Sequence, residues 1–167
     1  LTEARVAEFR DELAALARAK RPYRIVEPDE LARVAGTTHH EGVCVVTRPI
    51  EELSLEALCR RTGRSIVLAA PGLENPHNLG AILRIAAHFG ADALLLEESD
   101  PRLGPAACRV AEGGAEHVAV VRVPRMGPAV ARLRSAGHAI LATSSHVPGA
   151  VSLFDVALPE RLVWLVG

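Results

Sequence analysis

The chain has 167 residues, of which 49% are hydrophobic and 23% charged, which is typical of a folded protein rather than a disordered one. Its formal net charge of −1 excludes a polycation that binds nucleic acid by bulk attraction, although Lys20 is the only lysine among 19 basic residues. No apolar run approaches the roughly 18 residues of a membrane helix, so we expect no membrane partner. The cysteines, Cys44, Cys59 and Cys108, form no Cys-x-x-Cys pair, which favours free thiols in a reducing cytoplasm.

Residues 1–48 are expected to be the C-terminal part of a small α/β domain. One amphipathic helix is predicted over residues 1–20. Its apolar positions are Leu1, Val6, Phe9, Leu13 and Leu16. A short strand at 23–26, a helical turn from Pro28 and a strand at 42–46 follow. Since a segment of this size is small for an independent core, we expect the front of the domain to be absent.

Residues 49–64 are predicted to be a connection with a short helix, capped by Ser54 and ended by Gly63. From residue 65 apolar strands alternate with helices. The strands are expected at 66–70, 93–96, 118–123, 138–143 and 162–166, and the helices at 78–89, 106–112 and 127–136. This alternation predicts an open, mostly parallel sheet with helices on both faces. Ligands of such sheets bind beyond the carboxyl ends of the strands, at 71–80, 97–104, 124–126, 143–149 and after 166.

The loop that follows the first of these strands is the most informative stretch. It contains Asn75 and Asn78, and it continues into a helix that carries Arg84. Free backbone N–H groups at a helix start favour a phosphate or carboxylate, and both asparagines can donate and accept hydrogen bonds. A second interpretation is that Asn78 only caps the helix and Arg84 lies on a solvated face. A third is a Rossmann-like nucleotide site, but Gly72 and Gly80 lack its glycine spacing, and Glu97 and Glu98 are a weak match to its ribose-binding acid.

The pattern Asn75-x-x-Asn78-x-Gly80-x-x-x-Arg84 resembles the first signature motif of the SpoU/TrmH family, the SPOUT-class RNA 2′-O-ribose methyltransferases. Residues 85–91 are similar to the family's continuation of that motif. Residues 109–117 resemble its Arg-x-Ser-x-Gly-Ala-x-Glu-His segment, residues 162–167 the start of its second motif, and residues 38–43 its His-x-x-Gly-Val turn. Because these segments occur in the family's order, chance is a poor explanation.

The resemblance implies a homodimer that transfers the methyl group of S-adenosylmethionine to a ribose 2′-hydroxyl of tRNA or rRNA. It implies a SPOUT-type trefoil-knot domain at 65–167, preceded by a linker at 49–64 and the remnant of a small RNA-binding domain at 1–48. Since the second motif has barely begun at residue 167 and the third is absent, the knot is expected to be incomplete. The chain is expected to be truncated at both ends.

Motif positions also imply roles for individual residues. The expected catalytic residues are Arg84, Asn75 and Asn78. Arg84 would help to remove the hydroxyl proton, which is demanding for a group with a pKa above about 12, or would orient and stabilise the alkoxide. The expected cofactor contacts are Thr143, Val166 and Gly167, and the expected RNA contacts are Arg84, Arg109 and His117. Arg21 is a further expected RNA contact because it lies in a basic cluster near the start of the chain, for which a solvated surface is the alternative.

One residue departs from the family pattern, and one cluster of possible metal ligands remains to be considered. Ala111 stands where the family usually has a serine, so an RNA-binding paralogue without catalysis is the second hypothesis. No metal site is expected, because His39, His40 and Glu41 are adjacent, point apart and have no evident fourth partner.

Overall fold

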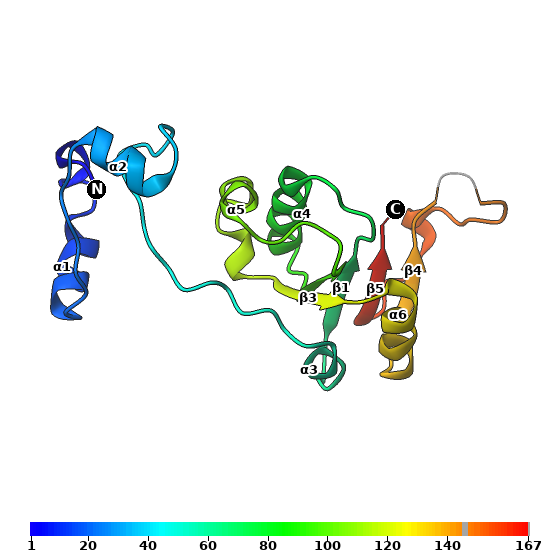
Figure 1. Ribbon diagram of the computed structural model, residues 1–167. Helices are drawn as coiled ribbons and strands as arrows, with labels where there is room; N and C mark the ends of the chain where they lie inside the picture. Colours follow the sequence, from blue (N-terminus) through cyan, green and yellow to red (C-terminus); the bar gives the residue numbers. More distant parts are fainter. Residues whose placement is uncertain (145–146, 167) are drawn as a thin grey trace. The chain divides into compact units, whose positions relative to one another are not determined.

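The computed structural model describes residues 1–144 and 147–166 and has two compact units, Leu1–Pro49 and a second unit that begins at Ile50 (Figure 1). The first unit contains a 3-10 turn, η1 (Glu3–Arg5), and two helices, α1 (Arg10–Arg18) and α2 (Pro28–Ala35). Pro28 occupies the first position of α2, where its missing N–H costs nothing. The helical turn predicted from Pro28 is therefore confirmed.

The single helix predicted over residues 1–20 is wrong in its first half. The backbone of Phe9 leaves the helical region, with φ −99° and ψ 23°, so α1 begins only at Arg10. A contact with Gly42 accompanies this interruption. The Thr2 N–H donates a hydrogen bond to the Gly42 carbonyl oxygen at 2.8 Å, which ties the first residues of the chain to a turn that is distant in sequence. A tertiary contact here overrides the local helical pattern.

The two strands predicted in this unit, at 23–26 and 42–46, do not form in the described structure. The first segment pairs only with the backbone of Leu1, and Val46 in the second is 88% exposed. A strand requires a neighbour that satisfies its backbone N–H and C=O groups. In the described part of the unit, Leu1 and Thr2 are the only residues distant in sequence that pair with the backbone of these segments, which is too few residues for a strand.

Five parallel strands form the sheet of the second unit in the order β3-β2-β1-β5-β4. They are β1 (Ser65–Ala69), β2 (Ala93–Glu97), β3 (Ala119–Val123), β4 (Ala139–Ala142) and β5 (Arg161–Leu165). Val67 at the centre of β1 pairs with Ala93 on one side and Val163 on the other. The predicted open parallel sheet is confirmed, with each predicted strand within a few residues of its place.

Helices cover both faces of this sheet, as predicted. α4 (Pro76–His88) and α5 (Pro105–Ala111) pack on one face, followed by the 3-10 turn η2 (Gly114–Glu116). α3 (Leu55–Cys59) and α6 (Met126–Ser135) pack on the other, and a third 3-10 turn, η3 (Leu153–Asp155), lies between β4 and β5. Neighbouring residues of β2 point to opposite faces, so Leu94 joins the first core and Leu95 the second. No helix in the described ranges is long and apolar enough to cross a membrane.

Most of the segment predicted as a connection, residues 50–64, belongs to the second unit and packs closely against its core. Ser54 caps α3 as predicted, because its Oγ accepts a hydrogen bond from the Ala57 N–H at 3.1 Å. Leu58 is fully buried beneath the sheet, and the Leu53 N–H donates to the Val120 carbonyl at 2.8 Å. The helix ends at Cys59, before the predicted Gly63.

A buried histidine at the amino edge of the sheet makes stability depend on pH. His138 is 2% exposed, with Nδ1 3.1 Å from the Leu133 carbonyl oxygen and Nε2 3.0 Å from the Ser65 hydroxyl. Burial lowers the pKa of His138 below its ordinary 6.5, and the nearby charge of Arg161 lowers it further, against the opposing hydrogen bond to Leu133. The fold therefore favours the neutral ring.

The stabilisation by His138 is complete above pH 6.5 and is lost as the pH falls below that value, because the unfolded chain then binds the additional proton. Urea unfolding between pH 7.5 and 5.0 measures this loss. We expect the free energy of unfolding to fall more steeply with acidification in the wild type than in a His138→Gln variant. Equal slopes in the two proteins would contradict this role for the ring.

Candidate active site

The carboxyl ends of β1, β4 and β5 meet at one edge of the sheet. The Thr143 N–H donates to the Leu165 carbonyl at 3.0 Å, and the Val166 N–H donates to the Ala69 carbonyl at 2.9 Å. Thr143 and Val166, two of the predicted cofactor contacts, are thus brought to the edge where the loop after β1 begins, and both are exposed. Gly167, the third predicted contact, lies outside the described residues.

Asn75 determines where α4 begins. Its Oδ1 accepts a hydrogen bond from the His77 N–H at 2.8 Å, and Pro76 takes the first helical position. Asn78 lies inside the first turn, where its own N–H donates to the Asn75 carbonyl at 3.0 Å. The interpretation in which Asn78 caps the helix is therefore wrong, and its exposed side chain is available to a ligand.

Two variants separate the capping role of Asn75 from a role in chemistry. Asn75→Ala removes the cap and is expected to lower the free energy of unfolding by about 1 kcal/mol. Asn75→Asp keeps the cap acceptor but removes the amide donor, so we expect near wild-type stability with reduced methyl transfer. Chemical denaturation and a transfer assay on the same preparations measure both quantities. Full activity of Asn75→Asp would show that Asn75 acts only as a cap.

Two glycines allow the helices behind this loop to approach closely. A Cβ at Gly80 would collide with the Ala107 carbonyl oxygen and lie 2.7 Å from the Val110 Cβ. A Cβ at Gly114 would lie 2.8 Å from the Arg84 Cα. Because residues four apart share a helix face, Gly80 and Arg84 both face α5. The spacing of the first motif therefore has a structural reason.

This approach brings Arg84 to a carboxylate that sequence reasoning missed. Arg84 Nη1 lies 2.9 Å from Glu112 Oε1, and the two side chains are 57% and 59% exposed. Glu112 follows the last residue of α5 in the left-handed conformation, with φ 45°. The only indication of this carboxylate in the sequence is a charged residue directly before Gly113, at the end of the helix predicted over residues 106–112.

Ala111, the departure from the family pattern, is fully buried in the core between α4 and α5. The departure therefore falls at a buried position and not on the exposed surface.

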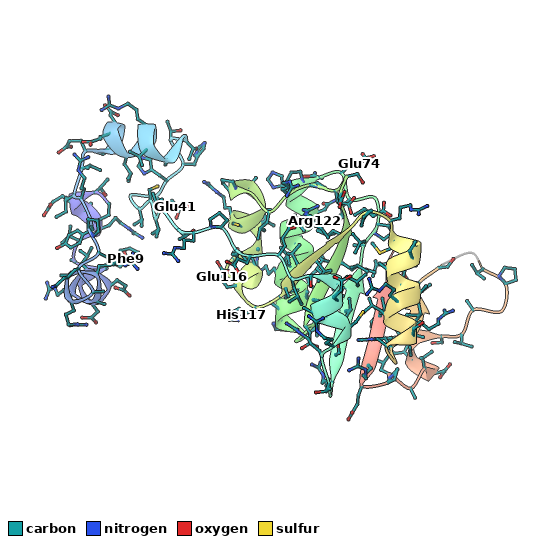
Figure 2. The ribbon with its side chains drawn as sticks, turned by 60° about the horizontal axis from the view of Figure 1, so that its bottom comes forward. Phe9, Glu41, Glu74, Glu116, His117 and Arg122 are labelled. Carbon is teal, nitrogen blue, oxygen red and sulfur yellow. The ribbon has the colours of Figure 1, made fainter. Side chains whose placement is uncertain are left out.

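The remaining predicted RNA contacts belong to different parts of the chain. Arg109 is exposed on α5, and Arg21 is exposed in the first unit. His117 precedes β3 and so lies at the amino edge of the sheet, opposite the edge reached by the first-motif loop. Figure 2 shows His117 well away from Glu74, which belongs to that loop.

A buried arginine, which sequence reasoning also missed, fixes the second loop of the carboxyl edge. Arg122, whose side chain is 6% exposed, donates to the carbonyl oxygens of Glu97, Asp100 and Pro101 and pairs with Glu52 at 2.8 Å (Figure 2). The strand predicted at 118–123 contains this residue, but the sequence gave no sign of its partners.

The carboxylate of Glu97 is also engaged. Its Oε1 accepts a hydrogen bond from the Met126 N–H at 2.7 Å, at the start of α6. It therefore caps a helix and is not a free acid for a nucleotide ribose, which argues against the Rossmann-like alternative.

The described residues contain no group of three or more His, Cys, Asp and Glu side chains that is able to hold a metal ion. In the predicted His-His-Glu run, the His40 Nδ1 accepts a hydrogen bond from the Gly42 N–H at 3.0 Å. Cys44, Cys59 and Cys108 are free thiols, and burial raises the pKa of Cys108.

Comparison with known proteins identifies the family. Residues 65–167 match the SpoU rRNA Methylase family, and residues 1–53 match the family described as RNA 2′-O ribose methyltransferase substrate binding. The chain belongs to the SpoU methylase family. The resemblance to this family that the motifs indicated is confirmed, and the alternative of a Rossmann-like nucleotide site is wrong.

The chain spans about half the length of the curated relatives that it matches. It is 32% identical over 160 residues to the uncharacterized tRNA/rRNA methyltransferase YfiF of Escherichia coli O157:H7, covering 95% of this chain and 46% of that protein. It is 33% identical over 147 residues to the 23S rRNA (guanosine-2′-O-)-methyltransferase RlmB of Nitrosomonas europaea, covering 86% and 55%. An AdoMet-bound rRNA methyltransferase from Sinorhizobium meliloti shares the fold, with a TM-score of 0.69, 18% identity and coverage of 98% and 60%.

Proposed function

We propose that this protein transfers the methyl group of S-adenosylmethionine to a ribose 2′-hydroxyl of tRNA or rRNA. The observation that carries the proposal is the first motif, complete in sequence and folded with structural roles for Asn75, Gly80 and Arg84. Asn75 starts the helix, Gly80 permits the contact with α5, and Arg84 emerges beside that contact. The names of the relatives support the reaction and the RNA class.

The strand ends at the carboxyl edge fit the cofactor. S-adenosylmethionine presents an adenine ring, a ribose and an amino acid, which require backbone hydrogen bonds and apolar contact. Thr143 and Val166 directly follow two adjacent strands and are themselves exposed. We assign Thr143, Val166 and Gly167 to the cofactor, which supplies an electrophilic methyl group on its sulfonium.

Arg84 acts in this proposal as a cation. A guanidinium stays positively charged in proteins, so it stabilises negative charge that develops on the ribose oxygen. Its N–H groups also orient the hydroxyl for in-line attack on the methyl carbon. Asn75 and Asn78 shape the loop that receives the ribose.

The remaining assignments follow from exposure and charge. Arg109 and Arg21 are exposed cations suited to phosphate oxygens, and we assign them and His117 to RNA contact. Ile85 on α4 and Phe89, the residue after α4, are 56% and 75% exposed, and these apolar side chains support a homodimer. The free thiols support a reducing cytoplasm.

The full-length protein, incubated with S-adenosylmethionine labelled in its methyl group and with separate tRNA and rRNA fractions, tests the proposal. We expect label in one RNA fraction and none in DNA of similar length. A protein that binds the cofactor and both RNAs but transfers no label would overturn the proposal and restore the paralogue without catalysis.

A further inference from the structure

We propose that Glu112 is a positioning residue for Arg84 and that the two side chains act as one unit in methyl transfer. The inference rests on the proposed function and extends it to a residue outside the first motif. It begins from the ion pair between Arg84 Nη1 and Glu112 Oε1 at 2.9 Å.

The pair is built by the backbone. Gly80 and Gly114 allow α4, α5 and η2 to approach until the residue after α5 lies opposite Arg84. The two partners come from α4 and from the cap of α5, so their separation is set by helix packing and not by local sequence.

A gain in folding stability does not explain why a glutamate occupies position 112. Its φ of 45° and ψ of 50° place it in the left-handed region, where a non-glycine residue is strained. An exposed ion pair contributes little to stability. The fold therefore gains little stability from glutamate over glycine at this position. We infer that the role of the carboxylate is to orient the Arg84 side chain.

The carboxylate restrains a flexible side chain. A free arginine side chain loses rotamer entropy when it is fixed, and this cost is lowered if the side chain is held before RNA arrives. A guanidinium has five N–H donors in a plane, so a bond at Nη1 leaves the others for the ribose oxygen.

The carboxylate also offsets the charge of Arg84 before substrate binds. Glu112→Gln keeps the shape but leaves Arg84 less restrained and the local charge more positive. We therefore expect a split between binding and turnover: kcat falls about ten-fold, while KM for RNA stays level or decreases because a phosphate meets an uncompensated cation. A residue that only stabilised the fold would not give this split.

Three variants of the full-length protein test the inference. Glu112→Gly relieves the left-handed strain, so we expect it to unfold no more easily than the wild type and yet to show the same loss of kcat. Glu116→Gln is the matched control, an exposed acidic residue of the same segment with no ion pair among the described residues, and should keep wild-type kinetics. In an Arg84→Ala background, Glu112→Gln should cause no further loss, because the pair acts as a unit.

A kcat of Glu112→Gln and Glu112→Gly within two-fold of an active wild type would overturn the inference alone. A wild type that transfers no methyl group would overturn the proposed function, and this inference with it. Slow rotation of the Arg84 guanidinium in ¹⁵N NMR spectra, lost in Glu112→Gln, is expected without RNA or cofactor and checks the restraint independently of activity.

Discussion

Arg84→Ala is expected to lower kcat for ribose methylation by about 10²–10³-fold, the range for loss of one group that stabilises developing negative charge. The side chain is exposed and lies away from both cores, so the free energy of unfolding should change by less than about 0.5 kcal/mol. Binding of S-adenosylmethionine, measured by calorimetry, should be unchanged. Transfer kinetics at saturating cofactor give kcat directly.

Two further substitutions make the Arg84 experiment specific. Arg84→Lys retains a charge but loses the planar fork, so we expect most of the defect to remain. Arg134→Ala removes an exposed arginine from α6, on the other face of the sheet, and should behave as the wild type. Equal turnover by Arg84→Ala and Arg134→Ala would remove Arg84 from the mechanism.

Gly80→Ala is expected to lower the free energy of unfolding by about 1–3 kcal/mol, the cost of an added methyl in a closely packed contact. The upper end of this range applies here, because the new Cβ collides with the backbone carbonyl of Ala107, which cannot rotate away. Urea denaturation measures the loss. Since α5 must move, the Arg84–Glu112 pair should separate and turnover should fall as well.

Gly127→Ala is the matched control for this substitution. Gly127 also lies within a helix, but a Cβ there meets no atom within 4 Å. Alanine is the better helix former, so stability should rise by up to about 1 kcal/mol. If Gly80→Ala were as stable as Gly127→Ala, the close approach of α4 and α5 would not be a requirement of the fold.

The sheet could be predicted from sequence because its strands are short, continuous apolar runs separated by helices of regular length. The 93–96 run is buried on both faces, as a central parallel strand requires. The predicted strands of the first unit failed for the opposite reason. Their apolar residues lacked a hydrogen-bonding neighbour, and a strand depends on a partner that its own residues do not specify.

The candidate site was predictable only where local chemistry determines structure. Asn75 and Pro76 together determine the start of a helix, although one of the two physical interpretations of the loop placed the cap at Asn78. The meeting of Arg84 and Glu112 depends on the packing of two helices through Gly80, which no local pattern contains. The contacts of Arg122 could not be predicted for the same reason, since its partners are backbone carbonyl oxygens of another loop.

The position of the transferred methyl group tests the central claim most directly. RNA labelled by the full-length protein should be hydrolysed with alkali, which cleaves next to a free 2′-hydroxyl but not next to a 2′-O-methyl group. We predict that the label survives in alkali-resistant dinucleotides and that Arg84→Ala removes it. Label recovered in mononucleotides would place the methyl group on a base and would contradict the account.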